Sequence, residues 1–349
     1  MKNILYISPS PRVKGGISTV IKGYLTSNLG KHHNLYLVAS HVDGPKWLKL
    51  IKGVVGLVET FYYLAYKNIN VVHIHAGDTI SFKRKFYYAK LASVFSCKVI
   101  YHHHGAAFMP QYKTLSKKWK NRVKRIFEGV DLLICLSNNW RNNIRRIAPN
   151  ANIKVIPNSV TLPKLDREKP NSVARLSFLG LIGDRKGVFD LLKVFKRLIN
   201  DGYNVRLSIA GNGETKRLIN EVEELELCDS VQYCGWLGDK EKDLLLRKTD
   251  IFVLPSYAEG MPMSILEAMA YCIPVISTPV GGIPELVLDG ETGFLIKPGD
   301  QGALYQSLTR LIQNKNPRKE FGNRGRELIR TKYNIDLISE KLSIVYNSL

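Results

Sequence analysis

Two glutamates frame the stretch SYAEGMPMSILEAMAYCIPVIS, in which Glu259 and Glu267 stand eight positions apart. Pro262 suits the first position of a helix, where its missing N–H costs nothing, and the residues after it are predicted to continue that helix. Eight helical rises span about 12 Å, which is comparable to the length of a diphosphate flanked by two sugars. A helix N-terminus facing the phosphates, with a carboxylate on each side to accept hydrogen bonds from sugar hydroxyls, would bind such a molecule. The alternative is a pair of surface glutamates on an amphipathic helix.

Several loops that follow predicted strands carry glycines, and one of them also carries basic residues. Glycine lets a backbone approach an anion closely, and the start of the following helix adds N–H groups and a positive dipole. A single loop of this kind is more often a plain tight turn, but such loops in both halves of the chain favour a nucleotide with a diphosphate. The loops are PRVKGGIST, FLGLIGDRKG and IAGNGE, and their candidate anion-binding residues are Gly15, Gly16, Arg185, Lys186, Gly211 and Gly213.

Five histidines lie near the ends of two predicted strands, VVHIHAG and YHHHG. Side chains alternate along a strand, so His73 and His75 share one face, and His102 and His104 share a face while His103 takes the other. We interpret His73 and His75 either as lining the acceptor side of a transfer site or as polar caps at a strand end. Metal binding by the triple histidine is the sharper alternative, and the sequence does not favour it.

The elements that must position these residues alternate between short apolar strands and helical stretches. KNILYIS, NVVHIHAG and KVIYHHHG precede the break KVIPNSVTLPKLDREKP at residues 154–170, and ARLSFLG, VRLSIAG and DIFVLPS follow it. This alternation indicates βαβ units and parallel sheets covered by helices on both faces. We therefore predict an α/β chain of two doubly wound, Rossmann-like domains that face each other across a cleft, with a linker at the break and ligands at the carboxyl ends of the strands.

Composition and length narrow the class of protein. The 349 residues are sufficient for two cores, and 45% of them are apolar, as in ordinary globular proteins. The five cysteines form no C-x-x-C pair, so neither a zinc site nor a redox motif is indicated. The first apolar run is too short for a signal peptide, and no run reaches the roughly 18 apolar residues of a spanning helix. We expect a cytoplasmic protein, either soluble or peripheral to the inner face of the cell membrane.

The net charge of +21 is confined to the first half of the chain. Residues 1–165 contain 26 Lys and Arg against 5 Asp and Glu, whereas residues 166–349 contain 25 of each sign. Basic residues mixed with aromatic ones are typical of interfacial helices, which anionic lipid attracts. A nucleic-acid surface and a merely soluble basic surface are the alternatives, and no nucleic-acid motif accompanies the charge. The candidate membrane-binding residues are Lys83, Arg84, Lys85, Lys117, Lys118 and Lys120, beside the aromatic residues Phe86, Tyr87, Tyr88 and Trp119.

Beyond these patterns, the chain resembles the retaining glycosyltransferases of family 4 (glycosyl transferases group 1), which have the two-domain GT-B fold and include many bacterial surface-polysaccharide enzymes. The resemblance extends over essentially the whole chain. It rests on KVIPNS, LSFLGLIGDRKGVFDLLKVF, LSIAGNGE, DIFVLPSYAEGMPMSILEAMAYCIPVISTPVGGIPELVLDGETGFLIKPGD and FGNRGRELIRTKYN. It implies an acceptor- and membrane-facing domain at residues 1–162, a nucleotide-sugar donor domain at 163–334, and a last helix at 335–349 that packs back on the first domain.

The resemblance also implies roles for individual residues. It places Glu259 toward the transferred sugar, Glu267 toward the ribose and His104 near the reacting sugar, where its charge state can respond to charge at the anomeric centre. His104, Glu259 and Lys186 are accordingly the expected catalytic residues. The other residues that the resemblance places at the donor are Gly260, Met261, Pro262 and Ile265.

The expected donor-phosphate contacts depart from the family pattern at one position. Lys186 matches the usual lysine, but Leu181 stands where family members usually carry an arginine. Arg185 either replaces that arginine, since a guanidinium binds phosphate bidentately, or is a solvated loop charge. The chain contains no D-x-D pair of the kind that holds a diphosphate through a divalent metal. We therefore expect neutralisation by Lys186 and a helix dipole, with no metal and no cofactor.

The expected activity is retaining transfer of a hexose or N-acetylhexosamine from a nucleotide-sugar, with a UDP-sugar favoured, to a lipid-linked or polysaccharide acceptor. The product would be a cell-surface polysaccharide such as lipopolysaccharide or capsule. A sugar-nucleotide epimerase or a phosphorylase of the same fold, and a non-enzymatic membrane or nucleic-acid binder, are the alternatives. An epimerase needs no acceptor surface, so the basic half disfavours it, and the joint presence of Glu259, Glu267, Lys186 and His104 disfavours loss of activity. The sequence does not define the sugar, the base, the acceptor or the oligomeric state.

Overall fold

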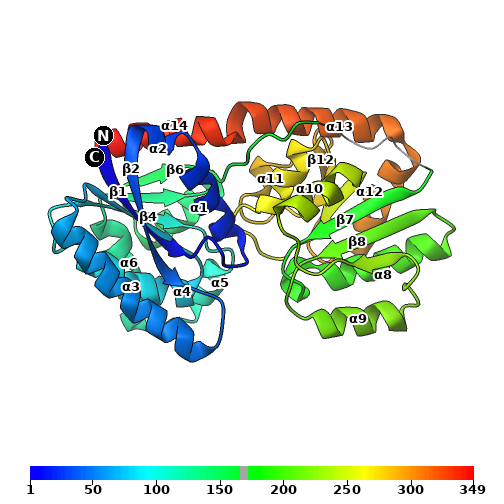
Figure 1. Cartoon of the computed structure of the whole chain (residues 1–349). Coiled ribbons are helices and arrows are strands. Elements are labelled where there is room, and N and C mark those ends of the chain that lie inside the picture. Colours follow the sequence, from blue (N-terminus) through cyan, green and yellow to red (C-terminus); the bar gives the residue numbers. More distant parts are fainter. Residues whose placement is uncertain (166–171) are drawn as a thin grey trace. The chain divides into compact units, whose positions relative to one another are not determined.

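The computed structural model describes residues 1–165 and 172–349 and divides the chain into two units (Figure 1). Unit 1 consists of Met1–Thr161 together with Tyr333–Leu349, and unit 2 consists of Leu162–Lys332. Unit 1 is therefore built from both ends of the chain, whereas unit 2 comes from one continuous segment.

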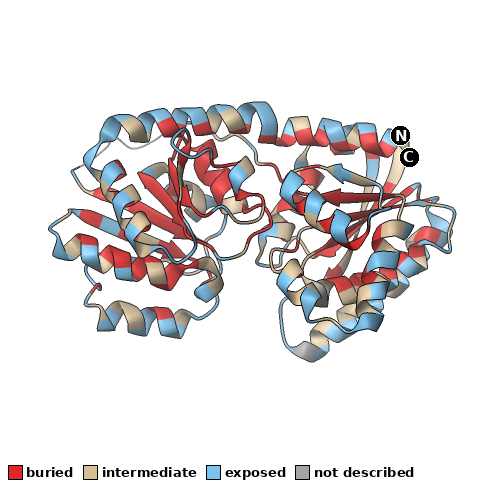
Figure 2. Cartoon of the chain, turned by 180° about the vertical axis from the view of Figure 1, so that it is seen from behind, coloured by how far each residue is buried: buried red, intermediate tan, exposed pale blue. Residues whose placement is uncertain are grey.

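Unit 1 contains a parallel six-stranded sheet in the order β2-β1-β3-β4-β5-β6. Strands β3 and β4 are buried almost throughout, including the histidines near their carboxyl ends, and Figure 2 shows the sheet as the buried layer beneath paler helices. Because β2 and β3 lie on opposite sides of β1, the strand order reverses there, and such a point is where doubly wound sheets bind ligands. The strands are β1 (Lys2–Pro9), β2 (His33–His41), β3 (Val71–Ala76), β4 (Lys98–His103), β5 (Leu132–Cys135) and β6 (Ile153–Val155).

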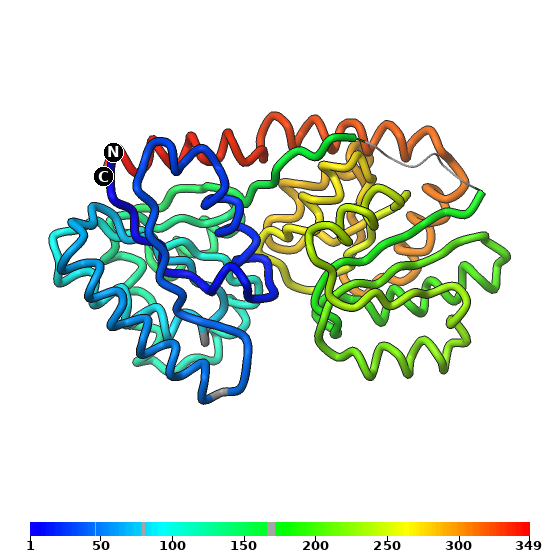
Figure 3. The backbone as a smooth tube through the Cα atoms, viewed as in Figure 1, coloured from blue at the N-terminus to red at the C-terminus, as the bar shows by residue number. Residues whose placement is uncertain are grey.

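The helices of unit 1 include the last helix of the chain, α14. The start of α14 is hydrogen-bonded to the end of the N-terminal segment of this unit. Val160 N donates to Tyr333 O at 3.0 Å, and Ile335 N donates to Val160 O at 3.1 Å. In Figure 3 the two termini lie side by side in this unit, where Lys2 Nζ donates to the backbone oxygen of Asn347 at 3.3 Å. The helices are α1 (Gly16–Thr26), α2 (Leu29–His32), α3 (Lys46–Tyr66), α4 (Thr79–Ala92), α5 (Phe108–Lys113), α6 (Lys117–Gly129), α7 (Asn138–Ile147) and α14 (Ile335–Ser348).

Unit 2 repeats the architecture with a parallel six-stranded sheet in the order β12-β11-β10-β7-β8-β9. Here β8 and β10 lie on opposite sides of β7, so the strand order reverses between β7 and β10. The loops that leave the carboxyl ends of these two strands are therefore the expected ligand-binding loops of this unit. The strands are β7 (Ala174–Leu179), β8 (Val205–Ala210), β9 (Val231–Tyr233), β10 (Ile251–Leu254), β11 (Val275–Ser277) and β12 (Gly293–Leu295).

The helices of unit 2 surround this sheet and include two short 3-10 turns and a π-helical turn. Helix α8 begins directly after the glycine-bearing loop of β7, and α11 begins after the loop of β10. The elements are η1 (Asp184–Lys186), α8 (Val188–Asn200), α9 (Thr215–Glu224), α10 (Asp239–Lys248), α11 (Met263–Ala270), η2 (Ile283–Glu285), α12 (Gln301–Gln313), α13 (Lys315–Leu328) and η3 (Ile329–Tyr333).

The predicted fold class, two doubly wound parallel α/β domains, is confirmed in each unit. The start of the predicted linker is wrong, because Ile153–Val155 forms β6 at the edge of the first sheet. A strand of three residues is too short to show a periodic pattern, so the prolines that follow it dominated the prediction. Residues 166–170 of the predicted linker lie outside the described residues.

Candidate functional site

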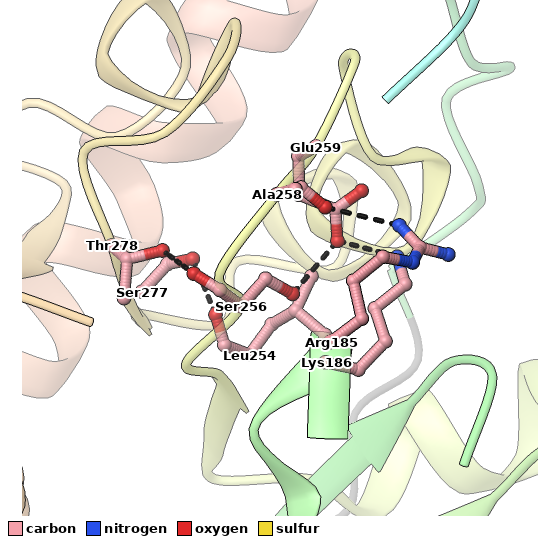
Figure 4. Close-up of polar contacts among 8 residues, drawn as sticks. All are labelled: Arg185, Lys186, Leu254, Ser256, Ala258, Glu259, Ser277 and Thr278. Carbon is pink, nitrogen blue, oxygen red and sulfur yellow. Dashed lines mark hydrogen bonds and ion pairs between the residues drawn. The ribbon is translucent and has the colours of Figure 1, made fainter. Parts of the chain in front are cut away.

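The first candidate cluster lies in unit 2, on the loops that leave β7 and β10. Glu259, from the β10 loop, is only 5% exposed. Ser256 Oγ donates to Glu259 Oε1 at 2.8 Å, and Lys186, at the end of η1, forms an ion pair with the same oxygen (Figure 4). A buried carboxylate needs such partners, because desolvation penalises an unpaired charge. The structure therefore brings Glu259 and Lys186 together, two of the three expected catalytic residues.

The β7 loop and the β10 loop are also joined through their backbones. Arg185 Nη1 donates to Ala258 O at 3.0 Å (Figure 4). In addition, Tyr257 N donates to Arg185 O at 2.8 Å. Gly187 has φ +71°, and a Cβ at this position would lie 2.2 Å from Pro255 O, so only glycine permits the approach. The description of Arg185 as a solvated loop charge is thus wrong, because its guanidinium holds the backbone beside Glu259.

Hydroxyl groups fix the β10 loop from the side of β11. Thr278 Oγ1 donates to Ser256 O at 2.5 Å, and Ser277 Oγ donates to Leu254 O at 2.6 Å (Figure 4). All three hydroxyl-bearing side chains in this group, including Ser256, are fully buried. Sequence reasoning missed them, because isolated Ser and Thr residues beside prolines look like ordinary turn residues.

A third loop supports Glu259 through two further glycines that were not predicted as site residues. Gly281 has φ +59°, and an added Cβ would lie 1.9 Å from Glu259 O. Next to it, Gly282 N donates to Gly260 O at 2.7 Å. The available signal was the glycine pair in STPVGGIPE, which directly follows a predicted strand. These glycines allow two loop backbones to touch, and that contact sets the position of Glu259.

The second glutamate of the opening motif lies on α11 and is 9% exposed. Lys242 Nζ from α10 forms an ion pair with Glu267 Oε1 at 2.5 Å. Burial raises the pKa of Glu267, and the ammonium of Lys242 acts in the opposite direction. The helix begins at Met263 with Pro262 as its N-cap, so the prediction that Pro262 occupies the first helical position is wrong by one residue. The reason is the extended backbone of Pro262, whose ψ is 125°.

Two predicted donor-binding residues next to this motif have buried side chains. Met261 is 3% exposed and Ile265 is 0% exposed. Both side chains belong to the core of unit 2. A ligand at the start of α11 would therefore meet their backbone groups only.

Gly211 and Gly213, from the loop after β8, are explained by contact with the β7 loop. A Cβ on Gly211 would lie 1.8 Å from Gly180 O, and a Cβ on Gly213 would lie 2.3 Å from Ile182 O. Ile182 N also donates to Asn212 O at 2.7 Å, which extends the pairing of the two strands into their loops. The close backbone approach accounts for both glycines without a ligand.

The second candidate cluster lies in unit 1, where four histidines form an array at the carboxyl ends of β3 and β4. The rings of His73 and His75 stack with centroids 4.3 Å apart, and those of His102 and His104 stack at 4.2 Å. Hydrogen bonds connect the two stacks, from His73 Nε2 to His102 Nδ1 at 3.2 Å and from His75 Nδ1 to His104 Nε2 at 2.9 Å. The predicted sharing of strand faces is confirmed, and His103 packs on the other face against Phe108.

His73 cannot line an acceptor site, as one of the two interpretations required. It is 0% exposed, and its Nδ1 lies 2.7 Å from the hydroxyl of Tyr346 on α14, which in turn lies 2.7 Å from the hydroxyl of Tyr6. His75 is also fully buried, beneath His104. The reason is that α14 covers this part of the sheet through Tyr346. The resemblance implied that the last helix packs back on this domain, but not which side chains it would bury.

His104 is the only member of the array that keeps partial exposure. The surrounding packing lowers the pKa of His104 to about 3, and neighbouring histidines contribute to the shift. Burial likewise lowers the pKa of His73 and that of His103 to about 3. The imidazole of His104 is therefore neutral at physiological pH.

The array also offers the one described group of side chains with metal-ligand character. His73, His75 and His102 each place a nitrogen within 4.8 Å of the others. Both nitrogens of His73 already make hydrogen bonds, with Tyr346 and His102, so a metal ion would have to displace one of them. The geometry thus favours hydrogen bonding over coordination.

The loops next to His104 include one residue that was not predicted. Asp78 Oδ1 accepts a hydrogen bond from Ala107 N at 2.9 Å, and a Cβ on Gly105 would lie 2.9 Å from the same oxygen. Asp78 therefore holds the turn that directly follows His104. Gly15 and Gly16 begin α1 as predicted, and no atom lies within 4 Å of a Cβ built on Gly15, so this backbone is open.

One predicted membrane-binding lysine is in the core of unit 1. Lys85 is 0% exposed, and its Nζ donates to Ile7 O at 2.9 Å and to Ser40 Oγ at 2.5 Å. Burial lowers the pKa of Lys85 well below its ordinary value. Tyr88, expected to insert into lipid, is also buried and donates to Gly53 O at 2.8 Å. Both predictions are wrong because consecutive residues of α4 point to different sides of the helix.

The other predicted basic residues are at least partly exposed. Lys117 and Lys118 are exposed, and Lys83 Nζ lies 5.1 Å from the ring centre of Trp119, which joins α4 to α6. Two residues are partly buried and engaged: Arg84 contacts His41, and Lys120 Nζ donates to a backbone oxygen of the α5 end.

Family models match both parts of the chain. The model described as Glycosyltransferase Family 4 matches residues 23–163, and the model described as Glycosyl transferases group 1 matches residues 165–328. The chain belongs to glycosyltransferase family 4. The second match contains Lys186, Glu259 and Glu267, and the first contains the histidine array.

Two relatives of this family 4 chain carry names that refer to polysaccharide biosynthesis or to a cps region. The capsular polysaccharide biosynthesis glycosyltransferase CapM of Staphylococcus aureus is 31% identical over 50% of this chain and 46% of its own length. A 41.2 kDa protein in the cps region of Klebsiella pneumoniae is 27% identical over 91% of this chain and 92% of its own. The chain thus spans about half of the first relative and nearly all of the second.

Solved structures with this fold show that the chain is a GT-B protein. Sucrose-phosphate synthase from Thermosynechococcus elongatus has a TM-score of 0.85 at 20% identity, covering 100% of this chain and 99% of that one. HepE from Anabaena, solved in complex with UDP, has a TM-score of 0.78 at 16% identity, with 100% of both chains covered. In the described part of this chain, no helix combines the length and the hydropathy of a membrane span.

Proposed function

We propose that this family 4 protein transfers a sugar from a nucleotide-sugar to a saccharide acceptor during synthesis of a surface polysaccharide. The observation that carries the proposal is the buried cluster of Glu259, Lys186 and Ser256 at the point where the strand order of unit 2 reverses. The carboxylate of Glu259 and the ammonium of Lys186 come from loops and not from the core. They can accept and donate hydrogen bonds to a charged sugar derivative. A relative named for capsular polysaccharide biosynthesis and one located in a cps region support the choice of product class.

The donor in this proposal is a nucleoside diphosphate-sugar bound by unit 2. Lys186 and the start of α11 supply positive charge for the diphosphate, and Glu267 accepts hydrogen bonds from the ribose. HepE has been solved with UDP and also with UDP-glucose, which supports a UDP-sugar. Glu259 then lies toward the transferred sugar, next to the ammonium that binds its leaving group.

We further propose that the diphosphate is neutralised without a metal ion. The support is that Lys186 is already within contact of Glu259 and that no D-x-D pair occurs in the sequence. The anomeric configuration is expected to be retained, as the resemblance to retaining enzymes implies. Because Glu259 is already paired with Lys186 and Ser256, we expect front-face attack in place of a covalent intermediate. The acceptor then attacks from the face that the leaving phosphate vacates, and that phosphate takes the acceptor's proton.

We also propose that the acceptor is linked to lipid and that unit 1 binds an anionic membrane surface. The strongest support is α3, which carries a row of exposed apolar side chains at intervals of three and four residues. Exposed lysines of α6 add the positive charge that anionic lipid attracts. In this proposal the protein acts at the inner face of the cell membrane. The exposed apolar residues of α3 are Trp47, Leu50, Ile51, Val54, Val55, Val58, Phe61, Tyr62 and Tyr66.

The test of the function is a transfer assay with separate readouts for donor and acceptor. Purified protein is incubated with UDP- and GDP-sugars, with and without lipid-linked saccharides, and both nucleotide release and product are followed. We expect nucleotide release that depends on acceptor, a product with the donor's anomeric configuration, and activity that persists in chelator. Interconversion of the donor sugar without acceptor would instead identify an epimerase, and loss of activity in chelator with rescue by Mn²⁺ would contradict the metal-free site.

A further inference from the structure

Helix α10 contacts α11 through the side chains of two neighbouring residues. Lys242 Nζ forms an ion pair with Glu267 Oε1 at 2.5 Å, and the hydroxyl of Tyr271 donates to the carboxylate of Asp243. Glu267 and Tyr271 are four residues apart, so the two contacts are about one helical turn from each other. Arg247 Nε in turn donates to Asp243 Oδ2 at 2.8 Å, within α10. Because α10 is bound to α11 at two points, the ammonium of Lys242 has a defined position beside Glu267.

The two carboxylate oxygens of Glu267 have different surroundings. Oε1 is bound by Lys242, whereas Oε2 makes no hydrogen bond with the described residues. Oε2 also keeps contact with solvent, although Glu267 as a whole is only 9% exposed. One oxygen is therefore held by the protein, and the other is open to a ligand.

The charge of Glu267 depends on the groups that face it. Burial raises the pKa of Glu267, Asp239 on α10 raises it further, and the ammonium of Lys242 is the influence that lowers it. Tyr271 keeps its proton, because burial raises its pKa. From α13, Arg326 donates to a backbone oxygen at the end of α11, and the strands β10 and β11 carry no charged residue. Among the described residues, Lys242 is thus the cation that contacts this carboxylate.

An ionised Glu267 and a protonated one bind hydroxyl groups differently. A carboxylate only accepts hydrogen bonds, so its Oε2 suits a hydroxyl that donates. A protonated carboxyl is a weaker acceptor and carries a hydrogen of its own. Hydrogen bonds to an ionised group are roughly twice as strong as those between neutral groups. Loss of the charge of Glu267 would therefore weaken its contact with a hydroxyl donor.

We propose that Lys242 is a positioning residue of the donor site: it keeps Glu267 ionised and holds Oε1, so that Oε2 accepts a hydrogen bond from a ribose hydroxyl of the donor. Lys242 acts through Glu267 and makes no contact with the donor in this proposal. The contact with ribose rests on the proposed function, whereas the effect of Lys242 on Glu267 does not.

A purely structural ion pair is the alternative role for Lys242. Exposed ion pairs contribute little, but the side chain of Glu267 is 12% exposed and that of Lys242 is 24% exposed, so solvent screens this pair weakly. A structural pair would affect the stability of unit 2 without changing how ligand binding depends on pH. A positioning residue that controls the charge of Glu267 would change that dependence.

The histidines of the chain interfere little with such a pH measurement. All 8 of them belong to unit 1, and none is in residues 162–332. The packing around His104, the histidine expected near the sugar, lowers its pKa to about 3. The diphosphate of a nucleotide-sugar is esterified at both ends and keeps its charge near neutral pH. A pH dependence that appears only after Lys242 is replaced can therefore be assigned to a carboxyl group.

The first measurement is the ionisation of Glu267 in the ligand-free full chain, by carboxyl ¹³C NMR with the signal assigned by Glu267→Gln. We expect the proton affinity of Glu267 to rise about tenfold or more in Lys242→Met, because the contacting cation is lost. Lys242→Arg keeps the charge and should resemble wild type. If Lys242→Met does not fold, Lys242→Gln makes the same comparison, since it removes the charge but can still donate to Oε1. Equal proton affinities with and without the cation would overturn the proposal.

The second measurement is the affinity for UDP-glucose and GDP-mannose, and for their 2′,3′-dideoxy analogues, between pH 5.5 and pH 7.5. Wild type should prefer the ribose form by about tenfold to a hundredfold, the factor that one lost polar contact costs. In Lys242→Met this preference should decrease as the pH is lowered. The double variant Lys242→Met with Glu267→Gln should show no such trend. Lys240→Met, which removes an exposed cation from the same helix, should behave as wild type.

The outcomes separate this inference from the proposed function. A preference for ribose that depends on pH in the same way in Lys242→Met and in wild type would overturn the positioning role of Lys242, even if the variant binds more weakly. If wild type binds neither nucleotide-sugar, the proposed donor is wrong, and the contact with ribose is refuted with it. The NMR comparison then still decides whether Lys242 controls the charge of Glu267.

Discussion

At the scale of single residues, the ion pair of Lys186 with Glu259 joins two groups that we expect to meet different parts of the donor. The side chain of Lys186 is 12% exposed and that of Glu259 is 5% exposed. Solvent therefore screens neither charge well, and each depends on the other. The pair consequently contributes to folding as well as to the site.

We expect Lys186→Met to destabilise unit 2 by up to about 3 kcal/mol, because it leaves the carboxylate of Glu259 buried and unpaired. The double variant Lys186→Met with Glu259→Gln is expected to recover most of this loss, since neither charge remains. Thermal unfolding of wild type, both single variants and the double variant measures the coupling. Neither the single variants nor the double variant should transfer sugar. A double variant as unstable as Lys186→Met would show that the broken ion pair does not cause the loss of stability.

The buried histidines predict how acid affects unit 1. His73 and His103 have a folded pKa of about 3, against an ordinary value of 6.5. Between these values the unfolded chain binds more protons, so stability is complete above pH 6.5 and falls as the pH drops toward 3, by about 1.4 kcal/mol per pH unit for each histidine. Unfolding midpoints in urea at pH 7.5, 6 and 5 measure the slope. His103→Phe should reduce it, and His32→Phe, at an exposed histidine, should leave it unchanged.

Much of the site could be predicted at this scale, because charged residues in a glycine-rich motif leave a clear signal. Glu259 and Lys186 carried this signal, and the structure brings them together, whereas the expected role of His104 came from the family resemblance. Ser256, Asp78 and the hydroxyl of Tyr346 were not predicted, because their importance comes from partners that are distant in the sequence. Tyr346, for example, contacts a histidine 273 positions away. Such contacts have no local pattern.

At the scale of elements, the loop after β11 positions the loop that carries Glu259. Gly281→Ala should impair both stability and turnover, because its Cβ would lie 1.9 Å from Glu259 O. Gly290→Ala is the matched control, since Gly290 also has positive φ, +72°, but no atom lies within 4 Å of its Cβ. The backbone strain is then common to both variants, and only the clash differs. Unfolding temperature and transfer rate are the measurements, and equal effects would assign the loss to strain alone.

The row of exposed apolar side chains on α3 predicts that substitutions on this helix affect membrane binding, whereas substitutions on a helix of unit 2 do not. Val54→Glu with Val58→Glu places two carboxylates in the apolar row, which should reduce co-sedimentation with phosphatidylglycerol vesicles and transfer to a lipid-linked acceptor. Donor binding should not change. Ile219→Glu is the control, because Ile219 is 44% exposed on α9 of unit 2. If the α3 variant binds vesicles as strongly as wild type, α3 is not part of the membrane-binding surface.

Elements with repeated patterns were the predictable part of the fold. Strands such as β1, β3 and β10 were recognised because apolar runs end in turn residues. β6 was missed because three residues carry no period. Lys85 was misplaced for a related reason: a run of basic residues on a helix indicates a charged face, but the helix turns by about 100° per residue, and one of three neighbours faces the core.

At the scale of the whole molecule, the charge asymmetry predicts how the protein responds to salt. Co-sedimentation with phosphatidylglycerol vesicles should weaken as salt is raised, since exposed charges are screened beyond about 8 Å at physiological ionic strength, and neutral vesicles should bind little. Lys117→Glu with Lys118→Glu should reduce binding. Lys216→Glu with Lys319→Glu makes the same change of charge on exposed residues of unit 2 and should not. If wild type ignores anionic vesicles at low salt, the basic surface does not bind membranes.

The composition of unit 1 from both ends of the chain has a consequence for biosynthesis. A ribosome delivers residues 162–332 before residues 333–349, so unit 2 is complete while unit 1 still lacks α14. The usual order, in which the N-terminal domain folds first, is therefore expected to be reversed in this chain. Until α14 arrives, Tyr6 and His73 have no Tyr346 to contact. A premature stop codon within α14 would thus harm the first domain to be translated and spare the second.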